Sequence, residues 1–137
     1  MASKPVWVFL ACLVLFTAVP GCDSKEEFET CEMSEKMKSD CDFDSLTKTC
    51  DEFKTTCYAS CMVGDHPQCL DGPCMIFQFR QLGSTDTYKS TPFCTMECKK
   101  ADPCPAEGAC DDCPKGSTCL PFLDKFYCVP DEHIVTQ

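Results

Sequence analysis

The predicted fold rests on residues 44–64, which read DSLTKTCDEFKTTCYASCMVG. One phenylalanine and three cysteines in this stretch recur at spacings of three, four and four residues: Cys50, Phe53, Cys57 and Cys61. These spacings place side chains on one face of an α-helix. Asp44 or Ser45 can cap the start of such a helix, and Gly64 can end it. The pattern therefore predicts a helix with a face rich in half-cystines.

The preceding segment is predicted to supply a partner helix. Between Lys25 and Val63 the chain has no glycine or proline, and its first part is rich in helix-favouring Glu and Lys. Cys31 and Cys41 are the expected partners of the half-cystine face. We therefore predict a disulfide-stapled α-helical hairpin over residues 25–64, with a turn near Asp40–Asp44.

Glycines and prolines punctuate residues 65–137, which indicates loops with short elements. Met75 to Arg80 reads as a strand, and a short helix is expected to begin at Thr91 and carry Cys94 and Cys98. A small hairpin is expected between Ser117 and Val129. The predicted fold class is thus a small disulfide-rich protein, with an α-helical hairpin followed by a loop-rich, cysteine-rich region containing short strands.

An apolar segment near the N-terminus predicts secretion. Val6 to Val19 is apolar apart from one threonine and follows the cation Lys4. It is shorter than the roughly 20 residues of a spanning helix and is typical of a secretory signal peptide. We expect residues 1–24 to be a signal peptide, the mature protein to be extracellular, and no membrane span. Cleavage after Gly21 also fits; it would retain Cys22, and the resulting odd cysteine count would imply a free thiol or a disulfide-linked dimer.

The chain has 16 cysteines, which in an oxidising compartment are expected to pair. Such spacings as Cys110-x2-Cys113 can also ligate zinc or act in redox chemistry, but disulfides are favoured behind a signal peptide. No metal and no cofactor are predicted. The half-cystines expected in a chain that starts at Lys25 are Cys31, Cys41, Cys50, Cys57, Cys61, Cys69, Cys74, Cys94, Cys98, Cys104, Cys110, Cys113, Cys119 and Cys128.

Charge and motif content narrow the function classes. The net charge of −10 makes phosphate backbones and anionic membranes poor partners, so no nucleic acid is expected to bind. His66 and His133 neighbour no nucleophile motif, and the chain is predicted not to be an enzyme.

Two stretches resemble known families. The first stretch reads Gly108-Ala-Cys110-Asp-Asp-Cys113-Pro-Lys-Gly116-Ser-Thr-Cys119, followed by Phe126-Tyr127-Cys128-Val-Pro130. It resembles part of an EGF-like module and part of trypsin-inhibitor-like cysteine-rich domains. The N-terminal half, with its cysteines on predicted helices, is similar to the disulfide-stapled helical hairpins of some marine-mollusc pheromones and large cone-snail toxins. These resemblances imply a secreted protein that works by surface recognition.

The predicted function is a toxin or signalling ligand that acts on a membrane receptor or an ion channel. Two loops are the predicted binding elements, Gln81–Thr91 and Leu120–Lys125, because each carries aromatic and charged residues on a cross-linked frame. Their candidate binding residues are Tyr88, Lys89, Phe122, Asp124 and Lys125. One alternative is a protease inhibitor that presents Lys125 or Met75 on a loop, and another is an extracellular matrix component.

Overall fold

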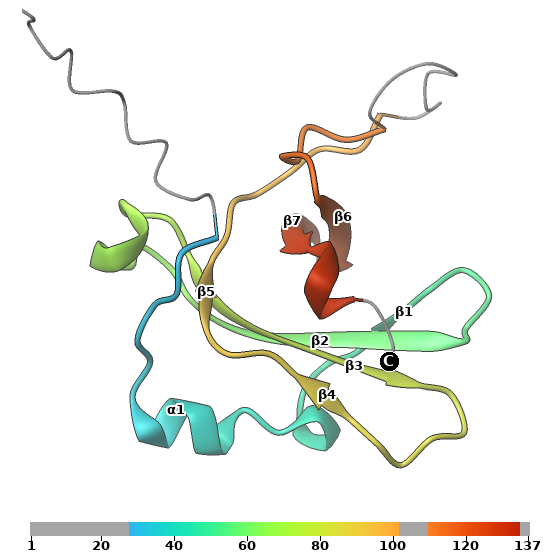
Figure 1. Cartoon of the computed structure of the whole chain (residues 1–137). Coiled ribbons are helices and arrows are strands. Elements are labelled where there is room, and N and C mark those ends of the chain that lie inside the picture. The colour runs from blue at the N-terminus through green and yellow to red at the C-terminus, as the bar shows by residue number, and fades with distance from the viewer. Residues whose placement is uncertain (1–27, 102–109, 135–137) are drawn as a thin grey trace, which may run out of the picture.

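The computed structural model describes residues 28–101 and 110–134, which form two antiparallel sheets (Figure 1). The larger sheet has the order β1-β2-β3-β4, and β5 also pairs with β3. The smaller sheet is the hairpin of β6 and β7. The strands are β1 (Thr49–Cys50), β2 (Thr56–Val63), β3 (Cys74–Gln81), β4 (Tyr88–Lys89), β5 (Phe93–Cys94), β6 (Ser117–Phe122) and β7 (Lys125–Pro130).

The predicted α-helical hairpin is wrong. Helical structure among the described residues is limited to α1 (Glu35–Asp40) and three short 3-10 turns: η1 (Phe43–Ser45), η2 (Pro67–Cys69) and η3 (Asp131–His133). The stretch expected to form the second helix instead contributes η1, β1 and β2. Cys57 and Cys61 are four residues apart, a spacing that puts two side chains on one face of a strand as well as of a helix. The sequence period was therefore ambiguous, and pairing of β2 with β3 along its whole length decides in favour of the strand.

The expected helix at Thr91 is also wrong, because Phe93 and Cys94 form β5 against β3. The predicted strand from Met75 to Arg80 is confirmed as part of β3, and the hairpin between Ser117 and Val129 is confirmed as β6–β7. The predicted division of the chain after residue 64 falls in the connection between β2 and β3.

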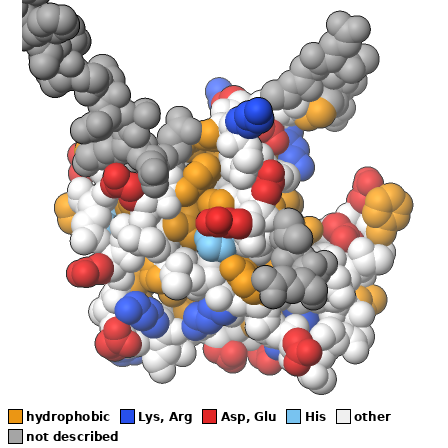
Figure 2. Space-filling view, viewed as in Figure 1, with side chains coloured by type: hydrophobic (Ala, Val, Ile, Leu, Met, Phe, Trp, Pro, Cys, Tyr) orange, Lys and Arg blue, Asp and Glu red, His pale blue; other side chains and the backbone are white. Residues whose placement is uncertain are grey.

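The β6–β7 hairpin packs on one face of the larger sheet and encloses the main core between them (Figure 1). Phe77 in β3 is fully buried, lies roughly parallel to Tyr58 of β2 at 6.0 Å between ring centroids, and meets Phe122 of β6 edge-on at 6.1 Å. Hydrophobic side chains gather along this junction in the space-filling view, while most charged side chains lie around the rim (Figure 2). The aromatic residues therefore join the two sheets.

The opposite face of the sheet is covered by the irregular segment that includes α1. Ile76 packs there with Met33 and Cys41, all nearly inaccessible to solvent. Gln78 is buried on β3, and its side-chain amide donates to the Cys41 carbonyl at 3.2 Å. This hydrogen bond satisfies a polar group that would otherwise be costly to bury.

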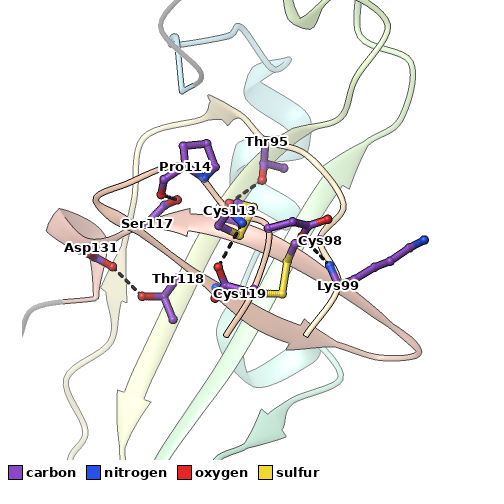
Figure 3. The surroundings of a disulfide bond; sticks show 12 residues. Thr95, Cys98, Lys99, Cys113, Pro114, Ser117, Thr118, Cys119 and Asp131 are labelled. Carbon is purple, nitrogen blue, oxygen red and sulfur yellow. Dashed lines mark hydrogen bonds between the residues drawn. A yellow bond between two sulfur atoms is a disulfide. The ribbon is translucent and has the colours of Figure 1, made fainter. Parts of the chain in front are cut away.

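Six disulfides join described residues to one another: Cys31–Cys74, Cys41–Cys61, Cys50–Cys57, Cys69–Cys94, Cys98–Cys119 and Cys113–Cys128. Cys110 is disulfide-bonded as well. Figure 3 shows the Cys98–Cys119 bond beside Cys113. The expectation of a cross-linked chain is thus confirmed, and so many bridges are typical of proteins from an oxidising, extracellular compartment. Cys104, Cys22 and the predicted signal peptide lie outside the described residues.

A candidate interaction surface at one end of the sheet

The exposed turn between β1 and β2 is constrained by a disulfide and by a backbone hydrogen bond. Cys50 and Cys57 lie directly opposite each other and form a disulfide across the two strands. Between them the Lys54 amide donates to the Asp51 carbonyl at 2.9 Å, which closes a four-residue turn. Lys54 itself has a φ of 56°, the left-handed conformation that reverses the chain. The bridge and this turn leave the loop little conformational freedom.

The side chain of Asp51 organises the rest of this turn. Its carboxylate accepts hydrogen bonds from the Thr55 amide at 2.7 Å, the Thr55 hydroxyl at 2.7 Å and the Thr56 amide at 3.1 Å. The hydrogen bond from the Thr55 side chain is the main reason that the pKa of Asp51 lies below its ordinary value of 3.8. The turn is therefore held by an ionised carboxylate at neutral pH.

Two large apolar side chains project from this end of the sheet without cover. Phe53 at the β1–β2 turn is 78% exposed, and Leu82 at the start of the β3–β4 loop is 74% exposed. The two loops are joined, since the Leu82 amide donates to the Thr55 carbonyl at 2.7 Å. In Figure 2 hydrophobic and acidic atoms project at the right-hand end, where the β1–β2 turn lies in Figure 1. We call Phe53, Leu82 and the pocket that Leu82 lines the tip surface.

The pocket of the tip surface has a volume of about 270 Å³. Arg80 forms one wall and lies 4.5 Å from the centre of the Phe43 ring. Its guanidinium also donates to both carboxylate oxygens of Asp44, at 2.8 and 3.3 Å, and this contact lowers the pKa of Asp44. The fixed cation and the aromatic face give the pocket a defined shape. Its lining residues are Phe43, Lys48, Cys57, Arg80, Gln81, Leu82, Gly83 and Ser84.

Tyr88 and Lys89, predicted as binding residues on the loop Gln81–Thr91, instead form strand β4 and make contacts within the chain. The Tyr88 hydroxyl is hydrogen-bonded to Nδ1 of His133 at 2.8 Å. The Lys89 ammonium donates to the Lys38 and Cys41 carbonyls, at 2.7 and 2.8 Å, at the end of α1. Both side chains thus fasten neighbouring segments to the sheet; a role in binding a partner stays a prediction.

The binding residues predicted on the loop Leu120–Lys125 lie in different surroundings in the structure. Phe122 is only 5% exposed and belongs to the core, so the expectation that it is an exposed loop residue is wrong. The reason is strand alternation, which turns Phe122 inward and leaves the next residue, Leu123, 72% exposed at the turn. Lys125 pairs with Glu97 at 3.0 Å, which raises the pKa of the lysine, and Asp124 occupies the turn.

Phe53 and Leu82 were missed as candidates. Phe53 was assigned to the apolar face of a helix that does not form, so its exposure could not be foreseen. The signal that was present is the pair Cys50 and Cys57, which can bridge a short loop around Phe53 as readily as it can mark a helix face.

Some side chains with metal-ligating atoms lie close together, but their chemistry is unsuited to a metal. One group comprises His66, Cys69 and Cys74, and two others consist of cysteines alone. Every cysteine in these groups is in a disulfide, and a disulfide sulfur lacks the thiolate that binds metal. His66 instead contacts the Glu32 carbonyl through Nε2 at 2.9 Å.

Comparison of the chain with protein-family models, curated proteins and solved structures finds no significant match. In the described residues no helix is long and apolar enough to cross a membrane. The tip surface is therefore the feature of the molecule from which a function can be inferred.

Proposed function

We propose that the protein is a secreted toxin or signalling ligand, which binds a membrane receptor or an ion channel through the tip surface. The observation that carries the proposal is the pair of apolar side chains, Phe53 and Leu82, exposed on two adjoining loops whose backbones are fixed. Contiguous exposed apolar surface is typical of binding sites, and the loops that carry Phe53 and Leu82 are joined by the hydrogen bond from the Leu82 amide to the Thr55 carbonyl.

The construction of the tip favours tight recognition. Ordering a flexible loop on binding costs free energy, and the Cys50–Cys57 bridge with the Asp51 hydrogen bonds removes much of that cost in advance. Aromatic side chains are also the kind of group that often dominates binding energy at protein interfaces. Phe53 is therefore the proposed anchor, and Leu82 with the pocket is the proposed second contact.

The geometry gives the protease-inhibitor alternative less support. Met75 is fully buried in β3, and Lys125 is held by Glu97 at the start of β7. A loop that occupies a protease active site is extended, whereas the residues around Phe53 form a closed turn ending in a left-handed residue. A panel of proteases titrated with the protein is expected to show no stoichiometric inhibition.

The proposal can be tested by binding of fluorescently labelled protein to a library of cells that each express one receptor or channel. Saturable binding to a member of the library is expected. The variant Phe53→Ser/Leu82→Ser is expected to lose at least about tenfold in affinity for it. The matched control is Leu123→Ser, because Leu123 is a similarly exposed leucine on the β6–β7 turn. Equal affinities for wild type and the double variant would exclude the tip surface.

A further inference from the structure

The disulfide at the base of the tip differs from the other bridges in its exposure to solvent. Cys50 is exposed and Cys57 is half-buried. Each of the other five bridges between described residues contains at least one buried half-cystine. A thiolate breaks a disulfide by attacking one of its sulfurs, and burial both hinders that attack and raises the pKa of a leaving thiol. The Cys50–Cys57 bridge is therefore better placed for this reaction in the folded protein than those five.

The Cys57 half of the bridge adjoins a cation. Cys57 on β2 lies opposite Cys50 of β1 on one side and opposite Arg80 of β3 on the other. Directly opposed residues project on the same face of a sheet, with Cβ atoms about 5 Å apart. Both Cys57 and Arg80 accordingly line the pocket of the tip surface. Cys50, Cys57 and Arg80 thus form one row across three strands.

The pocket that Cys57 lines is positively charged. It is lined by Lys48 as well as by Arg80, and none of the described residues that line it is acidic. The Lys48 ammonium lies 5.2 Å from the centre of the Phe43 ring and donates to the Leu46 carbonyl at 3.3 Å. Asp44, outside the pocket, pairs with Arg80 and offsets one of the two charges. A cation beside a cysteine lowers the pKa of its thiol, which makes that sulfur the better leaving group.

We propose that the Cys50–Cys57 bridge is a thiol–disulfide exchange site, and that its co-reactant is a small dithiol. One thiolate of the dithiol attacks the exposed Cys50 sulfur. The bond between the two cysteines breaks, and its electron pair stays on Cys57 as a thiolate beside the cations of the pocket. The second thiolate of the dithiol then attacks the mixed disulfide and releases Cys50. The dithiol is oxidised to a disulfide, and each reduced cysteine takes up one of the two protons that the dithiol loses.

Reduction at this site is expected to be local. β1 has only two residues and the bridge joins residues 7 apart, whereas β2 pairs with β3 along its whole length. Opening the bridge therefore frees the turn that carries Phe53 without separating β2 from β3. The exchange reaction does not depend on the proposed function. Its consequence for binding does rest on that function, because a loosened tip must be ordered again when it meets a target.

Partial reduction of the native protein tests the site directly. The protein is incubated with dithiothreitol, a small dithiol, at neutral pH without denaturant. Free thiols are trapped with a maleimide in mild acid and located by peptide mass mapping. Cys50 and Cys57 are expected to be labelled at least about tenfold faster than the half-cystines of the other five bridges between described residues. Equal or earlier labelling of any of those five bridges would overturn the proposal.

Circular dichroism of the partly reduced protein tests whether the reaction is local. The protein labelled only at Cys50 and Cys57 is expected to keep the β-sheet signal of the oxidised protein. Loss of that signal at this stage of reduction would contradict a site that opens without unfolding the sheet.

Variants with one cysteine of the bridge test the role of each sulfur. The Cys57 thiol in Cys50→Ser is expected to have a pKa below the ordinary value of about 8.5, because of the cations beside it. Cys57→Ser is the matched control, and its Cys50 thiol, which neighbours Asp51, is expected to ionise at or above that value. The pH dependence of alkylation measures both pKa values. A disulfide map that retains the other bridges shows that each variant is folded. Equal pKa values in the two variants would disprove Cys57 as the leaving sulfur.

Removal of one pocket cation tests the electrostatic argument with the bridge intact. Lys48→Gln is expected to slow the reduction of the bridge by dithiothreitol at least about threefold. Lys36→Gln is the control, because Lys36 is also an exposed lysine but lies on α1, and it is expected to leave the rate unchanged. Equal rates in the two variants would show that the pocket does not assist the exchange.

Discussion

The two sheets each contain a pair of facing cysteines that are bonded to other segments of the chain. In the larger sheet, Cys74 and Cys94 lie directly opposite each other on β3 and β5, yet they are bonded to Cys31 and Cys69. In the smaller sheet, Cys119 and Cys128 are opposite each other on β6 and β7, and they are bonded to Cys98 and Cys113. In both of these pairs the facing half-cystines belong to different bridges.

The bridges of these facing cysteines fasten other segments of the chain to the sheets. A bond between facing cysteines would join two strands that hydrogen bonds already hold. Bonds to Cys31, Cys69, Cys98 and Cys113 instead attach irregular chain to each sheet, and irregular chain has few hydrogen bonds of its own. The Cys50–Cys57 bond is the exception, since it joins facing residues at an exposed turn. Core bridges therefore hold the fold, and the bridge at the tip fixes a loop.

The largest expected loss of stability distinguishes the core bridges from the bridge at the tip. Cys31→Ala/Cys74→Ala removes a bridge between residues 43 apart, and Cys50→Ala/Cys57→Ala removes one between residues 7 apart. Loop-closure entropy predicts losses of about 4 and about 2.4 kcal/mol in the free energy of unfolding. Guanidinium unfolding of both variants measures the difference. Equal losses would contradict the distinction between core and tip bridges.

The next effect concerns the junction of the two sheets. Phe122→Ala removes the ring that packs edge-on against Phe77 and is expected to cost about 3 kcal/mol of unfolding free energy. The neighbouring Leu123→Ala is the control and is expected to change it by less than about 0.5 kcal/mol, because Leu123 is exposed. Similar effects of the two substitutions would mean that the hairpin does not depend on this contact.

How far the sequence predicted this structure depends on the ambiguity of each pattern. β3 was predicted because Met75 to Arg80 carries large apolar side chains that a strand can bury. The hairpin β6–β7 was predicted for a similar reason, with aromatic and β-branched residues flanking a turn. In β2 the cysteine spacing of four fitted both helix and strand, and long-range pairing with β3 decided between them.

The candidate site was less predictable still. The exposure of Phe53 and the burial of Phe122 follow from register and from the docking of one sheet on the other, which residue spacing alone does not encode. The disulfide partners were not predictable either, because the cysteines admit a very large number of pairings and the bridges found join residues from 7 to 43 apart.

A smaller effect on stability is expected from pH, at the junction of the two sheets. His133 packs against Phe93 and is hydrogen-bonded to Tyr88, and partial burial lowers its pKa below the ordinary value of 6.5, partly offset by Glu132. The unfolded chain therefore binds more protons between that lowered pKa and 6.5. The contribution of neutral His133 to the free energy of unfolding is expected to be fully present above pH 6.5 and to be lost as the pH decreases through this window.

Thermal unfolding between neutral and mildly acidic pH measures this dependence. His133→Phe is expected to remove the part of it that lies near pH 6, while His66→Phe, at the opposite end of β2 from the tip, is expected to keep it. A pH profile that is the same in His133→Phe and in wild type would show that the junction does not sense this proton.

The smallest effect on stability is expected at the tip, where Asp51 can be changed without touching the core. Asp51→Ala removes three hydrogen bonds from the β1–β2 turn, but the Cys50–Cys57 bridge keeps the strands together. The variant is expected to unfold at nearly the wild-type temperature, while NMR order parameters of residues 52–55 fall. Folding lowers the pKa of Asp51 below its ordinary value of 3.8. In the wild type the same loosening of the turn is therefore expected only at a pH below 3.8. Asp124→Ala on the β6–β7 turn is the control and is expected to leave the tip unchanged. If the order parameters stay high in Asp51→Ala, the disulfide alone fixes the tip, and the carboxylate contributes nothing to its preorganisation.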